Sequence, residues 1–345
     1  MIASVSIKVK KSNDAGVRWC GVLVDKTSPG RKRQPLQYEG WVFRFEGRAN
    51  SDKIGLARSA DDVENLHSAG KLTAIIGIEN SYPLGATAAE VEENFAKWAD
   101  RGALYASITH FGHNQFGGSS NPSFSRDDGP DMGLTELGLT LVKALNDHGI
   151  LVDVSHVGPK TAADAIEASR APVIASHSTV AAVHENPRGL TDDQLEAIRD
   201  TGGVAQITAY RSYIAEVDPR INAALSVLRT RLGTKSYADY LAASSETLDE
   251  LKREQKAIRA AFDDVTLSQF LDHVEHAIKV AGIDHVGLSG DFDGGGGVAG
   301  WDDAAETPNV TAGLLERGYS EDELAKLWGL NVLRVMRLAR AVASE

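Results

Sequence analysis

Cysteine is almost absent from this chain of 345 residues, in which Cys20 is the only one. A single cysteine excludes a disulfide within the chain and excludes a zinc site built from thiolates. The ligands of any metal ion must therefore come from histidine, aspartate or glutamate.

Long apolar runs are missing too. No stretch of about 18 or more apolar residues occurs, so the sequence predicts no membrane-spanning helix. The first residues do not form a secretory signal, because Lys8, Lys10 and Lys11 interrupt any apolar core. On these grounds we expect a cytoplasmic protein.

Positive charge is in deficit. The chain has 36 Lys and Arg residues against 48 Asp and Glu residues, which gives a formal net charge of −12. A nucleic-acid-binding protein usually carries a basic face, so this class of partner is disfavoured. A small-molecule substrate fits better, and a homodimer is the default assembly for a soluble enzyme.

Strand-like apolar runs alternate with helical patterns along most of the chain. This βα rhythm predicts a parallel sheet with helices outside it. The runs predict strands at 72–78, 105–109, 150–154, 172–175, 204–208 and 285–289, and helices at 89–101, 135–148, 160–169, 191–201 and 267–281. One or two further strands from the N-terminal part would complete a TIM-type (β/α)8 barrel.

Two segments depart from the rhythm. Residues 211–264 are charged and helix-forming and lack strand runs, so they predict a helical insertion before the last strand. Residues 1–51 are atypical: only 39–47 alternates like an exposed strand, and no conventional first βα unit is present. We therefore divide the chain into an atypical N-terminal segment, 1–51, and a barrel domain, 52–345.

Polar residues follow five of the predicted strands. They are Glu79, His110, His156, His177 and Asp291. The C-terminal ends of barrel strands form one mouth, where active sites lie, so we expect these side chains to converge. Imidazole nitrogens and a carboxylate oxygen suit Zn²⁺, which lowers the pKa of bound water.

Six motifs resemble the membrane dipeptidase (renal dipeptidase) family, the binuclear zinc peptidases of the amidohydrolase-like superfamily. They are IIGIENSYPLG at 75–85, SITHFGHN at 107–114, GILVDVSHVG at 149–158, RAPVIASHS at 170–178, GLSGDFDGG at 287–295 and GYSEDELAKLWGLNVLRV at 318–335. The resemblance spans residues 52–340 and implies a TIM-type barrel of the metal-dependent hydrolase type and zinc-dependent hydrolysis of dipeptides.

The resemblance also implies a role for each matching residue. Glu79 corresponds to the carboxylate that bridges two zinc ions, and His156 and His177 correspond to the other ligands of the second zinc. His110 corresponds to the histidine that polarises the scissile carbonyl of the bound substrate. Asp291 corresponds to the aspartate that moves a proton from water to the leaving amine.

Arg188, eleven residues after His177, corresponds to the arginine that binds the terminal carboxylate of the dipeptide. A guanidinium fork suits this role because it can donate two parallel hydrogen bonds to a carboxylate.

The family's first zinc requires a His-x-Asp pair at the end of the first barrel strand, and no such triplet occurs in this sequence. We therefore expect the first zinc site to be absent or very weak, which leaves one zinc. Residues 1–50 do not resemble the family, and a disrupted reading frame is one explanation, which sequencing the gene and its upstream DNA would test.

Four functions remain open on these grounds. The first is an active dipeptidase, and the second is a catalytically impaired or truncated family member. The third is a non-enzymatic barrel in which Arg188 binds carboxylates, and the fourth is another amidohydrolase-type reaction, such as hydrolysis of a lactone or an amide.

We expect His273 and His276 to be surface or second-layer residues, because their helix precedes the last strand.

Overall fold

The computed structural model describes residues 52–122 and 129–344, so the predicted segments 1–51 and 39–47 lie outside the described residues. The strands are β1 (Ile54–Leu56), β2 (Leu72–Ala74), β3 (Ile76–Ile78), β4 (Ala103–Ser107), β5 (Leu151–Asp153), β6 (Ile174–Val180), β7 (Gly189–Leu190), β8 (Val204–Thr208) and β9 (Val286–Ser289). The main helices are α1 (Ala60–Ser68), α2 (Ala88–Arg101), α3 (Glu136–Asp147), α4 (Pro159–Ala168), α5 (Asp192–Asp200), α6 (Arg211–Ile214), α7 (Pro219–Arg231), α8 (Tyr237–Ala242), α9 (Ser245–Ala260), α10 (Leu267–Ala281), α11 (Thr307–Glu316), α12 (Glu321–Ala325) and α13 (Asn331–Val342).

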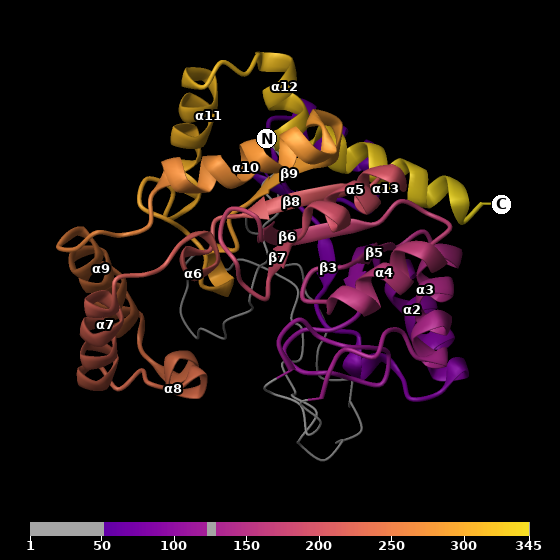
Figure 1. The fold of residues 1–345 in the computed structure, drawn as a ribbon, viewed down its shortest axis with the longest axis horizontal. Coiled ribbons are helices and arrows are strands. Elements are labelled where there is room, and N and C mark those ends of the chain that lie inside the picture. The colour runs from indigo at the N-terminus through magenta and orange to yellow at the C-terminus, as the bar shows by residue number, and fades with distance from the viewer. Residues whose placement is uncertain (1–51, 123–128, 345) are drawn as a thin grey trace.

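The predicted parallel sheet is confirmed. Its strand order is β3-β4-β5-β6-β8-β9, every pairing is parallel, and β7 adds to β6. The sheet curls as half of a barrel, with α2, α3, α4, α5 and α10 arranged around it (Figure 1). Parallel strands joined by helices place all their C-terminal ends at the same edge.

Capping residues begin several of these helices where the sequence predicts them. Thr191 and Gln194 form a capping box at the start of α5, in which each side chain bonds the other residue's backbone N–H. Thr87 and Glu90 do the same for α2. Such caps satisfy backbone N–H groups that lack partners within the helix, and so they fix the residue at which each helix begins.

Two predicted strands differ from the structure. The run 72–78 is divided, because β2 pairs with β1 in a separate two-stranded sheet whereas β3 pairs with β4. The strand predicted at 172–175 continues to Val180, because its second half pairs with β7. His177 therefore lies within β6, between register positions Ala175 and Ser178, where the pairing with β8 shifts.

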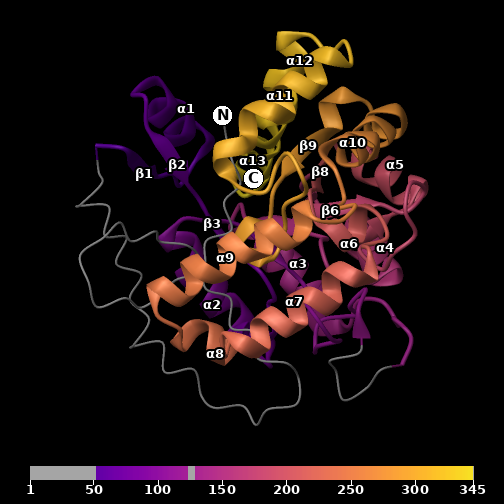
Figure 2. The ribbon, with the colours of Figure 1, turned by 90° about the vertical axis from the view of Figure 1, so that its left-hand side faces the viewer.

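Helices α6, α7, α8 and α9 stand between β8 and α10, in the part predicted as a helical insertion. Helices α7 and α9 pack side by side and extend away from the sheet (Figure 2). Five buried residues form a separate apolar cluster there, namely Ile221, Leu225, Leu228, Leu248 and Leu251. This insertion cluster gives α7 and α9 a small core of their own.

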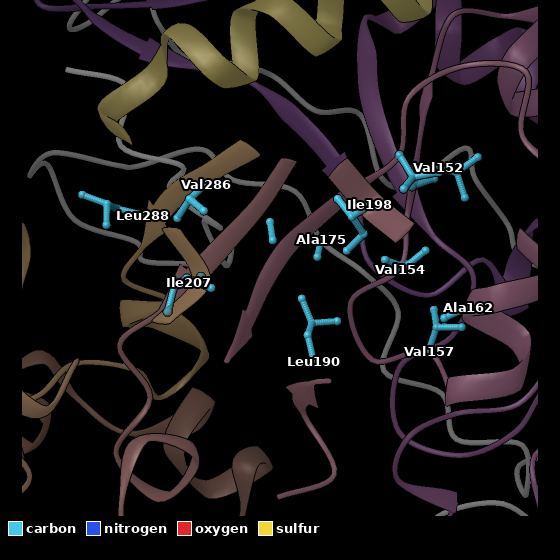
Figure 3. Packing of buried hydrophobic residues seen from close by; sticks show 14 of the residues in the cluster. Val152, Val154, Val157, Ala162, Ala175, Leu190, Ile198, Ile207, Val286 and Leu288 are labelled. Carbon is cyan, nitrogen blue, oxygen red and sulfur yellow. The ribbon is translucent and has the colours of Figure 1, made fainter. Parts of the chain in front are cut away.

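The main core lies between the sheet and its surrounding helices. Val152, Ala175, Ile207 and Val286, from four neighbouring strands, contribute buried side chains to it (Figure 3). Neighbouring residues of β5, β6 and β8, namely Leu151, Ile174 and Val204, join a second cluster that includes buried residues of α13. In the described part of the chain, no helix is both long enough and apolar enough to cross a membrane.

Candidate metal centre and substrate site

Three side chains converge at the C-terminal edge of the sheet. Glu79 directly follows β3, His156 lies just after β5, and His177 lies in β6. Glu79 Oε1 is 3.2 Å from His156 Nε2 and 3.3 Å from His177 Nε2, and the two Nε2 atoms are 2.9 Å apart. Among the described residues, these three form the one group of three potential ligand side chains that could hold a metal ion.

The chemistry of this donor set fits a zinc ion. Two imidazole nitrogens and one carboxylate oxygen are ligands that zinc prefers, and three protein ligands leave a position open for water or substrate. The Nε2 atoms of His156 and His177 are 2.9 Å apart, so two lone pairs that faced each other would repel. A proton or a cation between the two atoms removes this repulsion.

The backbone around the cluster is held in an uncommon conformation. Asn80 (φ 78°), His156 (φ 66°) and Asp291 (φ 44°) are the non-glycine residues with positive φ in the described chain. Each follows a strand end, and such conformations cost about 1–3 kcal/mol each unless the surrounding structure fixes them. Asn114 contributes to this fixing, because its Nδ2 donates to the Oδ1 of Asn80.

Protonation is set by contacts within the cluster. Burial tends to raise the pKa of Glu79, but hydrogen bonds to His156 and His177 outweigh it and hold that pKa well below its usual range. Burial, assisted by the charge of Arg188, holds the pKa of His156 well below its usual value. For His177, burial lowers the pKa, but the hydrogen bond to Glu79 and the charges of Asp291 and Glu79 together outweigh it, so its pKa is raised.

His110 lies against the same cluster. Its side chain is buried, its Nε2 is 3.5 Å from Glu79 Oε1, and its ring centroid is 4.3 Å from that of His156. Ser119 Oγ donates to the carbonyl oxygen of His110 and so holds this residue in place. The structure therefore places His110 beside the group formed by Glu79, His156 and His177.

Arg188 reaches the cluster from the segment before β7. It is 4% exposed, and its Nη2 donates to the carbonyl oxygen of His177 at 2.7 Å. Its Nε has no hydrogen-bond partner among the described residues. Burial lowers the pKa of Arg188, while the charges of Glu79 and Asp291, among others, oppose this effect. A guanidinium in this condition can bind a carboxylate without losing many existing bonds.

Asp291 follows β9, and its charge acts on His177 and Arg188. Its carboxylate lies against Gly294, where an added Cβ would come within 1.8 Å of Oδ1. A side chain at position 294 would therefore displace the Asp291 carboxylate from this place. The structure therefore brings Asp291 to the same site as the predicted ligands.

Tyr213, on α6, lies next to Arg188, with the guanidinium carbon 5.8 Å from its ring centroid. It stacks on Tyr210 at a centroid distance of 4.3 Å. Burial is the main cause that raises the pKa of both tyrosines, so their hydroxyl groups stay protonated at neutral pH. The two rings form an apolar wall beside the guanidinium.

Three further residues lie behind His177 and were not predicted from the sequence, namely Asp153, Ser155 and Ser176. Asp153 is fully buried, and Ser176 Oγ donates to its Oδ2 at 2.6 Å. Two features of the sequence indicate this network. They are a carboxylate within the otherwise apolar strand ILVDV and a serine before each ligand histidine.

Two other histidines lie apart from the site. His273 is fully buried: its Nδ1 accepts from the N–H of Val180, and its Nε2 lies 2.9 Å from the carbonyl oxygen of Ile214. His276 pairs with Asp192 at the surface. Both agree with the expected structural roles, with His273 in the second layer and not at the surface.

Comparison with known proteins places the chain in a family. The family model "Membrane dipeptidase (Peptidase family M19)" matches residues 8–345, so the expectation that residues 1–50 do not resemble the family was wrong for residues 8–50. Dipeptidase verJ of Clonostachys rogersoniana is 32% identical over 297 residues, which cover 86% of this chain and 62% of that protein. The chain thus spans less than two thirds of that relative's length.

Solved structures agree. The probable dipeptidase PvdM from Pseudomonas aeruginosa is 34% identical with a TM-score of 0.71, and the match covers 86% of this chain and 76% of PvdM. A metallo peptidase from Rhodobacter sphaeroides, liganded with a phosphinate mimic of the dipeptide L-Ala-D-Ala, is 26% identical with a TM-score of 0.65, covering 85% of this chain and 70% of that one. This chain therefore belongs to the membrane dipeptidase family and has its TIM-type fold.

Proposed function

We propose that this protein is a zinc-dependent dipeptidase, which hydrolyses the single peptide bond of a dipeptide. The observation that carries the proposal is the convergence of Glu79, His156 and His177 at the C-terminal edge of the sheet. Zinc supplies Lewis acidity, which lowers the pKa of water to about 7 and polarises a carbonyl group. Membership of the family, with its dipeptidase relatives, supports the same reaction.

The remaining residues serve substrate binding and proton transfer in this proposal. Arg188 binds the terminal carboxylate of the dipeptide, which would give its partnerless Nε a hydrogen-bond acceptor. His110 donates a hydrogen bond to the scissile carbonyl oxygen. Asp291 accepts a proton from the attacking water and delivers it to the leaving amine.

The chain alone is proposed to hold one zinc ion, at Glu79, His156 and His177. No other group of potential ligands occurs in the described residues, and the sequence has no His-x-Asp triplet. This favours one alternative, a catalytically impaired member of the family that binds dipeptides through Arg188 without hydrolysing them.

A dipeptidase assay distinguishes the two. Purified protein is loaded with zinc and given a panel of dipeptides, and the released amino acids are quantified. Hydrolysis that is lost in His177→Ala supports the dipeptidase. Dipeptide binding by calorimetry with no hydrolysis above the His177→Ala background would support the impaired member instead.

A further inference from the structure

A chain of hydrogen bonds runs from a buried carboxylate to the ring of His177. Ser176 Oγ donates to Asp153 Oδ2 at 2.6 Å, and the same oxygen is 2.8 Å from His177 Nδ1. Asp153, Ser176 and their neighbour Ser155 are all at most 2% exposed. Water is therefore largely excluded as an alternative partner for these groups.

The direction of these hydrogen bonds follows from the number of hydrogen atoms that each group can donate. A carboxylate can only accept hydrogen bonds, and a serine hydroxyl has one hydrogen to give. Because that hydrogen goes to Asp153, Ser176 Oγ must accept from His177 Nδ1. The hydrogen on Nδ1 is thereby fixed. In the metal-free protein Nε2 can also carry a hydrogen, which Glu79 accepts, and a metal ion would take the place of that hydrogen.

We propose that Asp153 and Ser176 are positioning residues, which fix the tautomer of His177 so that Nε2 is available to a metal ion. This inference rests on the metal site of the proposed function. Partners of this kind commonly change metal affinity by about 10–100-fold. His156 differs, because its Nδ1 is buried and has no hydrogen-bond partner among the described residues.

The substitution Asp153→Asn tests this proposal because it should reverse the direction of the hydrogen bonds between residue 153, Ser176 and His177. Oδ1 of Asp153 accepts from the backbone N–H groups of Ser155 at 2.9 Å and of Ser176 at 3.0 Å. These two donors hold the amide oxygen of the new asparagine at the Oδ1 position. The amide nitrogen must then face Ser176 Oγ and donate to it, so the serine hydrogen turns to His177 Nδ1. The ring hydrogen moves to Nε2, which no longer offers a lone pair.

Two measurements read this change. The tautomer of His177 is determined from long-range ¹H–¹⁵N NMR spectra of metal-free protein at alkaline pH. The protein carries the additional substitution Glu79→Ala, which removes the carboxylate acceptor of Nε2, and signals are assigned by their loss in His177→Gln. Zinc affinity is measured with Glu79 in place, by competition with a chromophoric chelator. We expect Nδ1–H when Asp153 is present, Nε2–H when it is replaced by asparagine, and zinc affinity that is about 10–100-fold weaker in Asp153→Asn.

Ser178→Ala is the matched control. Ser178 is also buried in β6, and its Oγ lies 3.5 Å from Ser155 Oγ, outside the hydrogen-bond chain from Asp153 through Ser176 to His177. Tautomer and zinc affinity should be unchanged in this variant. If Asp153→Asn does not fold, Ser176→Ala serves instead, since it removes the acceptor for Nδ1 and should yield a mixture of tautomers with weakened zinc binding.

Nδ1–H in Asp153→Asn, or zinc affinity equal to that of the wild type, would overturn the proposal. Its failure is distinct from failure of the proposed function. A wild type that binds zinc tightly but hydrolyses no dipeptide would contradict the dipeptidase, while the tautomer and the affinities still decide the role of Asp153.

Discussion

Arg188 Nη2 donates to the carbonyl oxygen of His177, so the guanidinium is fixed to the strand that carries a proposed metal ligand. A carboxylate bound by Arg188 is thereby held at a constant distance from the metal centre. This relationship suits a substrate with one peptide bond between its carboxylate and the reacting carbonyl. It accounts structurally for the preference for dipeptides in the proposed function.

Replacing Arg188 by alanine should raise KM and leave kcat less affected, because the carboxylate is bound in both the ground state and the transition state. Hydrogen bonds to charged groups contribute about 1.5–3 kcal/mol, which corresponds to an increase in KM of about 10–150-fold. Steady-state kinetics on one dipeptide measure this change. A C-terminally amidated dipeptide is the control, since the wild type should already bind it weakly. An unchanged KM for the ordinary dipeptide would contradict the assignment of Arg188.

Zinc content should be one equivalent per chain, by elemental analysis of protein dialysed against dilute zinc. Glu79→Gln and His177→Ala should each lose this zinc. Because the ion binds only the folded state, free zinc at about 1,000 times its Kd should stabilise the protein by about 4 kcal/mol, seen as a lower Tm after chelation. Two equivalents in the wild type would contradict the expected loss of the first site.

Stability should fall on mild acidification because of His273. Burial lowers its pKa from 6.5 to about 4. The unfolded chain binds a proton at this histidine more readily than the folded protein does. His273 therefore does not lower the free energy of unfolding above about pH 6.5, but lowers it by up to about 3 kcal/mol as the pH falls towards 4. Urea unfolding of the wild type and His273→Gln between pH 7 and pH 5 measures the difference in slope. His276→Gln, which replaces a partly exposed histidine on the same helix, is the control, and equal slopes for wild type and His273→Gln would refute the prediction.

Arg211 should be important for stability. Its guanidinium contacts Asp264 at 2.9 Å and Asp302 at 2.7 Å, and both Arg211 and Asp264 are largely buried. Arg211→Met leaves the buried Asp264 without its ion-pair partner and leaves Asp302 with Arg259 at 3.5 Å, so the free energy of unfolding should fall by about 3–5 kcal/mol. Arg231→Met, which removes solvent-exposed ion pairs with Glu250 and Glu254, should have a much smaller effect in the same denaturant unfolding. Similar losses in both variants would contradict this reading of Arg211.

The fold could be predicted from sequence because its strands and helices alternate with distinct periodicities and caps. Thr191 and Gln194 mark the start of α5 in the sequence as they do in the structure. The strand at 72–78 was wrong in detail, because apolar character does not reveal which partner each half pairs with. The extension of β6 to Val180 likewise depends on β7, which is too short to predict.

Much of the site could be predicted as well, because parallel strands bring their C-terminal ends together. The network of Asp153, Ser155 and Ser176 behind His177 could not be predicted, because serine is common in loops and turns and carries no periodic pattern. The direction of the Ser176 hydrogen bond follows only from atomic contacts with Asp153 and His177. Likewise, the αL conformation of His156 is visible in the backbone alone.

The separate insertion cluster of α7 and α9 has a consequence for local opening. A unit with its own small core and few links to the sheet can exchange its amide hydrogens without global unfolding. Hydrogen exchange should therefore be faster in α7 and α9 than in β5 and β6. Sequence changes on these helices would then be tolerated with little effect on the strands that hold His156 and His177.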